Sequence, residues 1–312
     1  MITEQALTFG TEIRPLFGHV VVLAGGAGVG KGAVIDNLID FPKAKYLNPD
    51  SLKKYVSYAD DISLKSSKTL VAMARVKSSQ KFKDYLIDHM EELLTKNNPS
   101  WDSKKVAEKT TRYKKALNTT IDMSNRELVS ELHYMFKDID MESNLLKTFT
   151  SSQMNPERLP NVIIDGTLKN LHKVETQLNL LVEAGYKPEN IHLVWVVNSN
   201  ENSKVNNAMR RRSVPESTRV ETLEMSTRNI VKMLKNREPI VDIICGNWYV
   251  VFSEFNMATK KTNIENPAKS RRTVFADYVM VKKPNQAPSL ENVSRKTLER
   301  IRHNLEWAEF DN

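Results

Sequence analysis

The chain has 312 residues, of which 40% are hydrophobic and 27% are charged, and its formal net charge is +8. This length fits one large domain or two small ones, and the single cysteine, Cys245, excludes an intramolecular disulfide and is typical of a reducing cytosol. No apolar run approaches the roughly 20 residues of a membrane span, and the first residues lack the basic and apolar pattern of a signal peptide. We therefore expect a cytoplasmic protein whose positive charge suits polyanionic ligands.

The first predicted element is a buried strand over His19–Ala24, and a glycine-rich loop follows it directly. Residues 25–32 read G-G-A-G-V-G-K-G, and the helix-like stretch Ala33–Ile39 comes next. This order is typical of the phosphate-binding loop G-x-x-x-x-G-K, in which glycines let backbone N–H groups face a polyphosphate beside a helix N-terminus. The alternative is an ordinary glycine-rich turn. We predict that ATP binds at Gly25, Gly26, Ala27, Gly28, Val29, Gly30, Lys31 and Gly32, with Lys31 reaching the β- and γ-phosphates.

The last position of this loop departs from the usual pattern. The motif normally ends in Ser or Thr, whose hydroxyl binds Mg²⁺, but Gly32 and Ala33 offer no hydroxyl. Mg²⁺ tolerates this because it keeps several waters. We therefore expect it to be held by carboxylates, phosphate oxygens and water.

A second strand is predicted over Lys45–Asn48, and an acidic residue, Asp50, follows it. Ligands of α/β sheets bind at the carboxyl ends of the strands, which places this carboxylate beside the phosphate loop. There it could accept a proton from an attacking hydroxyl or bind the metal through water. The alternative is a structural one, in which Asp50 caps the N-terminus of the next helix.

The next hundred residues are predicted to be helical, without a convincing strand. Amphipathic stretches cover Phe82–Leu94 and Glu127–Phe136, and Asn97–Ser100 interrupts the helical pattern. We interpret this part as a helical insertion over about residues 56–150, between the second and third strands. It either forms the acceptor pocket or covers a sheet edge.

Two further strands are predicted over Asn161–Asp165 and Ile191–Val197, with a helix over Asn170–Gly185 between them. This strand-helix-strand unit indicates a parallel sheet. Farther on, Ile240–Ile244 and Trp248–Phe252 flank Gly-Asn, which favours a tight hairpin. A strand over Thr273–Val281 and a terminal helix over Ser289–Trp307 complete the prediction.

Three motifs together resemble the zeta-toxin-like family of P-loop kinases, which has relatives in phages. That family pairs a phosphate loop with D-x-[FL]-R after the second strand and with an acidic-Gly-Thr-Leu-Arg run after the third. The corresponding runs here are Asp50–Lys53 and Asp165–Lys169. Lys replaces Arg in both runs, and Asp165 stands where Glu is usual. Because Lys is a point charge and not a bidentate fork, the identity of the acceptor is not carried over.

The resemblance implies an α/β fold, with a parallel-sheet P-loop kinase core and helices on both faces over residues 1–255 and a C-terminal β/α extension over 256–312. It also implies Mg²⁺-dependent transfer of the γ-phosphate of ATP to a hydroxyl. The family places arginines in a lid after the fourth strand, where Arg212 and Arg219 are our choices and Arg210 and Arg211 are alternatives. The implied catalytic residues are Asp50, Lys31, Arg212 and Arg219; those binding the acceptor are Lys53, Asp165, Thr167 and Lys169; and those binding the metal are Asp50 and Asp165.

The acceptor stays open at this point. One option is a small nucleotide or nucleotide sugar, and another is a hydroxyl on DNA or RNA, which the net charge and the basic stretch Ala258–Arg272 suit. A different class of function is a non-catalytic nucleotide-binding switch or slow NTPase. Such a module needs no acceptor-activating acid, so Asp50 favours the kinase. The oligomeric state is not indicated by the sequence.

Overall fold

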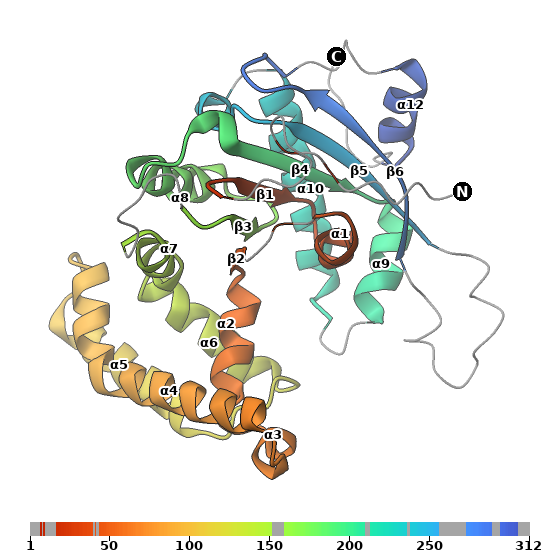
Figure 1. Cartoon of the computed structure of the whole chain (residues 1–312). Helices are drawn as coiled ribbons and strands as arrows, with labels where there is room; N and C mark the ends of the chain where they lie inside the picture. Colours follow the sequence, from red (N-terminus) through yellow and green to blue (C-terminus); the bar gives the residue numbers. More distant parts are fainter. Residues whose placement is uncertain are drawn as a thin grey trace, which may run out of the picture. The chain divides into compact units, whose positions relative to one another are not determined.

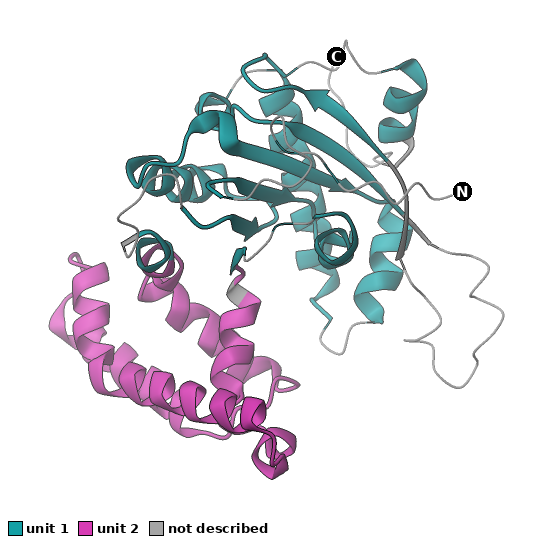
Figure 2. Ribbon diagram, viewed as in Figure 1, with its two compact units in different colours: residues 1–46, 146–312 teal, residues 47–145 magenta. Residues whose placement is uncertain are grey.

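A computed structural model describes residues 7, 9, 17–39, 41, 44–151, 159–209, 213–235, 238–255, 273–288 and 294–304. The chain divides into two compact units (Figure 2). We call residues 1–46 and 146–312 the sheet unit, and residues 47–145 the helical unit. No helix within the described ranges is long and apolar enough to cross a membrane.

A six-stranded sheet forms the sheet unit, in the order β2-β3-β1-β4-β5-β6 (Figure 1). β1 pairs in parallel with β3 and β4, β5 pairs in parallel with β4, and β6 is antiparallel to β5. Helices lie on both faces, so the predicted α/β class is confirmed. The strands are β1 (Val20–Ala24), β2 (Lys45–Leu47), β3 (Val162–Asp165), β4 (Ile191–Val197), β5 (Trp248–Phe255) and β6 (Thr273–Lys282).

The first four strands agree with the sequence prediction to within one residue at each end. All residues of β1 and β4 are buried, as expected for parallel strands covered on both faces. The predicted helix after β3 is also present. The helices of this unit are α1 (Lys31–Leu38), α8 (Leu171–Glu183), α9 (Asn200–Ala208), α10 (Glu216–Leu234) and α12 (Arg295–Asn304), with short 3-10 turns η2 (Pro188–Asn190) and η3 (Pro239–Asp242).

The predicted hairpin over Ile240–Phe252 is wrong. Its first half is the 3-10 turn η3, and β5 pairs with β4 and β6 instead. Gly246 is needed because its backbone packs closely against the start of β4, and not because it forms a tight turn. Its N–H donates to the Ile191 carbonyl oxygen at 2.8 Å, and a Cβ there would clash with the His192 ring. The strand predicted over Thr273–Val281 is confirmed as β6. The predicted terminal helix is found over Arg295–Asn304, and its remaining predicted residues, except Ser294, lie outside the described ranges.

Helices alone make up the helical unit after the last residue of β2. Leu86, Met90 and Leu94 on one face of α4 are fully buried and form a core with residues of α2, α5 and α6. The break predicted near Asn98 separates α4 from α5. The helices are α2 (Pro49–Ser57), α3 (Ile62–Ser66), α4 (Leu70–Asn97), α5 (Ser103–Asn118), α6 (Arg126–Asp138) and α7 (Met141–Ser151), of which α7 continues into the sheet unit.

A hydrogen-bonded pair of histidines, of which His192 is fully buried, lies at the amino end of the parallel strands. His192 Nδ1 accepts a hydrogen bond from the Asn247 backbone N–H at 2.9 Å, which leaves its Nε2 to donate to His19 Nδ1 at 3.0 Å. Burial, and then the charges of His19 and Lys282, hold the pKa of His192 well below its ordinary value. The folded protein therefore keeps His192 neutral.

The free energy of unfolding should decrease as the pH falls below about 6.5, because unfolded His192 then takes up a proton that the folded protein does not bind. Urea unfolding between about pH 7.5 and pH 5 measures this dependence. In His192→Asn, whose amide oxygen can replace the Nδ1 acceptor, the decrease over this range should be smaller. An equal decrease in both proteins would contradict this account.

Candidate phosphate-binding site

The glycine-rich loop leaves β1 at Gly25 and ends where α1 begins at Lys31. Gly25, Gly28 and Gly30 have φ values of +136°, +86° and +100°. L side chains rarely adopt this region of backbone conformation, so the path of the loop itself requires glycine at these positions.

Helices α9 and α10 pack directly on the loop. A Cβ at Gly26 would lie 2.6 Å from the Leu223 side chain of α10, and one at Gly28 would clash with the Ser203 carbonyl oxygen of α9. Gly32 differs, because a Cβ there would meet no atom within 4 Å. The missing hydroxyl at position 32 is therefore not explained by lack of space.

Three polar side chains hold the backbone of the loop. The Ala27 N–H donates to Thr222 Oγ1 at 3.1 Å, and Ser203 Oγ donates to the Ala27 carbonyl oxygen at 3.2 Å. Asn206 Nδ2 donates to the Gly28 carbonyl oxygen at 2.8 Å. The loop is thus fixed by hydrogen bonds as well as by steric contact.

Lys31 turns its ammonium group back onto the same loop. Its Nζ donates to the carbonyl oxygens of Gly25 at 2.7 Å and Gly26 at 3.1 Å. The ammonium group of Lys31, which the motif predicts to bind phosphate, therefore contacts the backbone of the same loop that is predicted to surround the phosphates.

Arg219, predicted as a lid residue, is instead only 1% exposed on α10. Its Nε and Nη2 bind the Glu216 carboxylate at 2.8 and 2.7 Å, and this hydrogen-bonded pair lowers the pKa of Glu216. Nη1 donates to Ser203 Oγ at 2.6 Å, and Nη2 donates to Asn200 Oδ1 at 2.6 Å. The guanidinium therefore joins α10 to α9 and reaches the loop through Ser203. The other predicted lid residues, Arg210, Arg211 and Arg212, lie outside the described ranges.

The Asp165–Lys169 run lies at the same edge of the sheet as the loop. Asp165 ends β3 in register with Leu23 of β1, and its Oδ2 accepts from the Tyr46 hydroxyl at 2.7 Å. Lys169 Nζ pairs with Glu221 of α10 at 2.6 Å, and its N–H donates to Thr167 Oγ1 at 3.3 Å.

Leu168, in the middle of this run, has a φ of +53°, which is costly for a side chain branched at Cγ. Asn229 of α10 holds this turn, because its Nδ2 donates to the carbonyl oxygens of Leu168 at 2.8 Å and Lys169 at 3.0 Å. Helix α10 therefore fixes the glycine loop through Thr222 and the Asp165–Lys169 run through Asn229.

Asp50 and Lys53 belong to the helical unit, in the first turns of α2. The cap of this helix is Asn48, whose Oδ1 accepts from the Asp50 N–H at 2.7 Å, so the alternative role of Asp50 as cap is wrong. Asp50 Oδ1 pairs with Lys53 Nζ at 2.6 Å, and the two side chains are 67% and 3% exposed. The exposed carboxylate is thus oriented by a buried lysine.

Sequence reasoning missed the residues that hold the loop, namely Ser203, Asn206 and Thr222. Asn and Ser are weak helix formers, and α9 (N-E-N-S-K-V-N-N-A) consists largely of them. That composition indicated that the polar side chains of α9 make specific contacts, because such residues are not favoured by helix propensity alone.

No protein-family model matches the chain, and no curated protein matches it. Among solved structures, the chain is similar to the AvrRxo1-ORF1:AvrRxo1-ORF2 complex with sulphate ions, at 14% identity, 91% coverage of this chain and a TM-score of 0.43. It is also similar to the same complex with ATP, at 13% identity, 92% coverage and a TM-score of 0.41. The chain spans 63% and 64% of the length of those matched chains.

A third similar structure comes from the PezAT chromosomal toxin-antitoxin system of Streptococcus pneumoniae. It is 13% identical and has a TM-score of 0.36, and the match covers 96% of this chain and 88% of that one.

Gly28→Ala should lower the free energy of unfolding by more than about 2 kcal/mol, because position 28 combines a positive φ with a backbone clash. Gly32→Ala is the matched control. It should be neutral or stabilising by up to about 1 kcal/mol, because Ala favours helix and finds open space there. Urea unfolding of both variants makes the comparison, and equal destabilisation would contradict the packing described here.

Proposed function

We propose that this chain is an ATP-dependent phosphotransferase that moves the γ-phosphate of ATP to a hydroxyl group. The observation that carries the proposal is the glycine loop at the end of a central, fully buried strand, with Lys31 at the start of the following helix. Phosphoryl transfer needs mainly positioning and charge neutralisation. A loop held by α9 and α10 provides a preformed cradle for such positioning.

Lys31 would neutralise charge on the β- and γ-phosphates. To do so its ammonium would exchange the carbonyl oxygens of Gly25 and Gly26 for phosphate oxygens. Arg219 would act as a positioning residue, because its guanidinium binds Glu216, Asn200 and Ser203. The lid cation that contacts the transferring phosphate would then be Arg212.

The donor set suits Mg²⁺, which prefers oxygen ligands and keeps several waters. No three His, Cys, Asp or Glu side chains group into a metal site within the described ranges. Asp165 would hold the ion in the sheet unit, since its carboxylate ends β3 beside the loop and its orientation is fixed by Tyr46. Asp50 is the second proposed ligand, and phosphate oxygens and water would complete the shell. When bound, the ion supplies charge neutralisation on the phosphates.

Asp50 would accept the proton of the attacking hydroxyl. Its exposed carboxylate and its pairing with buried Lys53 support this role, because the lysine fixes one oxygen while the side chain stays accessible. Lys53, Asp165, Thr167 and Lys169 would bind the acceptor. The acceptor is a small nucleotide or nucleotide sugar, or a hydroxyl on nucleic acid.

Lys31→Met should reduce phosphoryl transfer by more than about 100-fold, because the transferring phosphate loses its main fixed cation. γ-Labelled ATP incubated with separate pools of nucleotide sugars, RNA and DNA measures the transfer and identifies the acceptor class. Lys45→Met, which removes an exposed lysine of the same unit, is the control and should transfer normally. Near-normal transfer by Lys31→Met would remove the phosphate-loop assignment.

Asp50→Asn should lose most turnover while its affinity for ATP is retained, because the amide cannot take the acceptor proton. The control is Asn48→Ala, which removes the cap of the same helix. It should cost about 1 kcal/mol of stability and leave turnover nearly intact. Turnover and ATP binding are measured separately for both variants. Full turnover in Asp50→Asn would favour a slow NTPase or a binding module over the kinase.

A further inference from the structure

The most exposed large hydrophobic side chains of the described chain lie close together in the sequence of the helical unit. Leu70 is 83% exposed, Ile62 is 81% exposed, Val71 is 64% exposed and Met73 is 56% exposed. Scattered single hydrophobic residues on a surface are normal, but a cluster within twelve residues of sequence indicates an interaction site. This cluster is independent of the proposed phosphotransfer chemistry.

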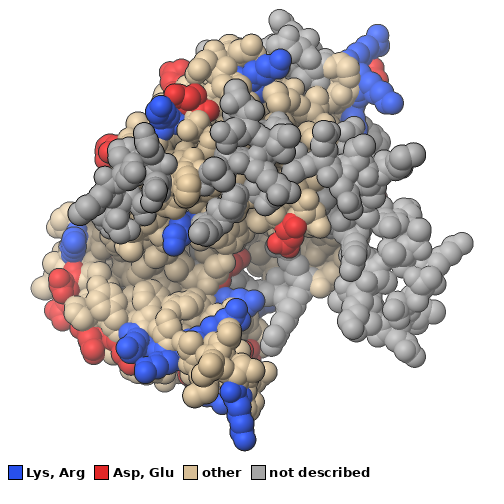
Figure 3. Space-filling model, viewed as in Figure 1, with Lys and Arg blue, Asp and Glu red and all other residues tan. Residues whose placement is uncertain are grey.

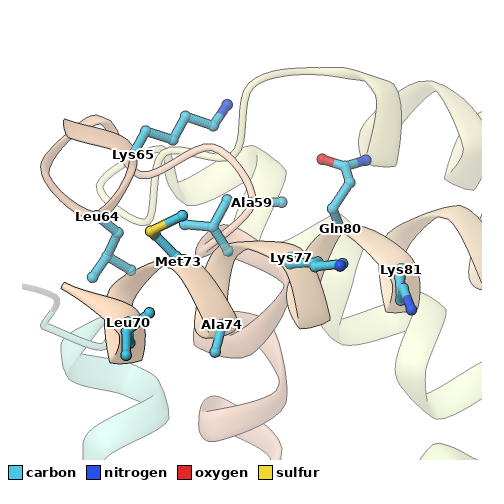
Figure 4. A pocket seen from close by; sticks show the side chains of 10 residues that line it. Ala59, Leu64, Lys65, Leu70, Met73, Ala74, Lys77, Gln80 and Lys81 are labelled. Carbon is cyan, nitrogen blue, oxygen red and sulfur yellow. The ribbon is translucent and has the colours of Figure 1, made fainter. Parts of the chain in front are cut away.

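A groove with a volume of about 680 Å³ lies between α3 and the first half of α4, and two of these exposed side chains, Leu70 and Met73, line it. Along α4 the side chains that line it recur at helical spacing, which puts them on one face of the helix. Figure 4 shows them in succession along α4, with Leu64 projecting from α3. The α4 residues of this face are Leu70, Met73, Ala74, Lys77, Gln80 and Lys81.

Lysines border the apolar part of the groove. Lys65, Lys77 and Lys81 line it and are exposed, and within the described ranges no carboxylate pairs with any of the three. The two acidic residues between Ala59 and Lys81 are already engaged, since Asp60 pairs with Lys83 at 2.8 Å and Asp61 caps α3. Figure 3 shows basic side chains over this end of the unit. The groove therefore combines an apolar floor with a border of lysines, and the nearest carboxylate farther along α4, that of Asp84, accepts from Gln80 Nε2 at 2.8 Å.

We propose that this groove binds an acidic amphipathic helix of a partner protein. A helix with apolar residues on one face would cover Leu64, Leu70 and Met73, which is the usual way in which a helical segment occupies a groove. Carboxylates beside that face would meet the three lysines. Nucleic acid fits less well, because none of the lining residues is aromatic and a phosphate backbone brings no apolar surface.

A synthetic, fluorescein-labelled helical peptide serves as the probe. It carries Leu at positions i, i+3, i+4 and i+7 and mainly Glu elsewhere, and its binding to the full chain is measured by fluorescence anisotropy. We expect saturable binding with a Kd in the range of about 1–100 μM, weakened by added salt. A peptide of the same composition without an apolar face, and one with Lys in place of Glu, should each bind at least about tenfold more weakly.

Variants of the groove locate the binding. Met73→Gln should lower the affinity of the chain for the acidic peptide at least about tenfold. The combined variant Lys65→Gln, Lys77→Gln and Lys81→Gln should lower this affinity by a similar factor. The matched control combines Lys96→Gln, Lys104→Gln and Lys115→Gln, which removes the same charge from exposed sites of the same unit and should leave binding unchanged. Melting temperatures check that every variant is folded.

Three outcomes would overturn the proposal. One is the lack of saturable binding at about 1 mM peptide. Another is equal binding by the groove variants and the wild type. The third is tighter, groove-dependent binding of phosphatidylserine-containing vesicles or of duplex DNA, which would assign the groove to a membrane surface or to nucleic acid.

Discussion

The steric contact between the glycine loop and helices α9 and α10 is the constraint on which the conformation of that loop depends. Gly26 and Gly28 have no room for a side chain because Leu223 and Ser203 occupy it. The two helices must therefore keep a fixed spacing from the loop. Buried Arg219 holds this spacing, because its guanidinium binds Glu216 of α10 through Nε and Ser203 of α9 through Nη1. One turn farther along α10, Thr222 Oγ1 accepts a hydrogen bond from the Ala27 N–H of the loop. Arg219 therefore links α9 and α10 beside the loop.

Helix α4 uses lysine in two opposite ways within two turns. Lys83 is buried and pairs with Asp60, whose carboxylate also accepts from the Ile121 N–H at 3.0 Å, so this lysine holds the helical unit together. Lys77 and Lys81 are exposed at the groove. A buried charge is tolerated only with a partner, whereas an exposed one needs none. The contrast separates charges that serve the fold of this unit from charges available to a ligand.

The sequence predicted what is decided locally. Buried strands are apolar runs, so β1, β3 and β4 were predicted well. The glycine loop is a motif in consecutive residues, and it lies between β1 and α1 as expected, while its binding of phosphate stays a prediction. The hairpin at Gly246 was wrong because the choice between a turn and a close approach depends on His192, more than fifty residues away. Asn48 was overlooked as the cap of α2, although Pro at the first helical position favours a cap just before it. The hydrogen bonds of Ser203 and Thr222 to the loop could not be predicted, because they depend on how the loop, α9 and α10 pack together in the folded chain.

The position of β1 has a consequence for how the anchor of the glycine loop unfolds. β1 is flanked by β3 and β4, and all five of its residues are fully buried. Backbone amides in such a strand exchange their hydrogens with water mainly through global unfolding, whereas edge elements open locally. The loop begins at the end of this strand, so fraying of the sheet edges at β2 and β6 leaves its anchor intact. We therefore expect the start of the glycine loop at Gly25 to unfold only when the sheet unit as a whole unfolds.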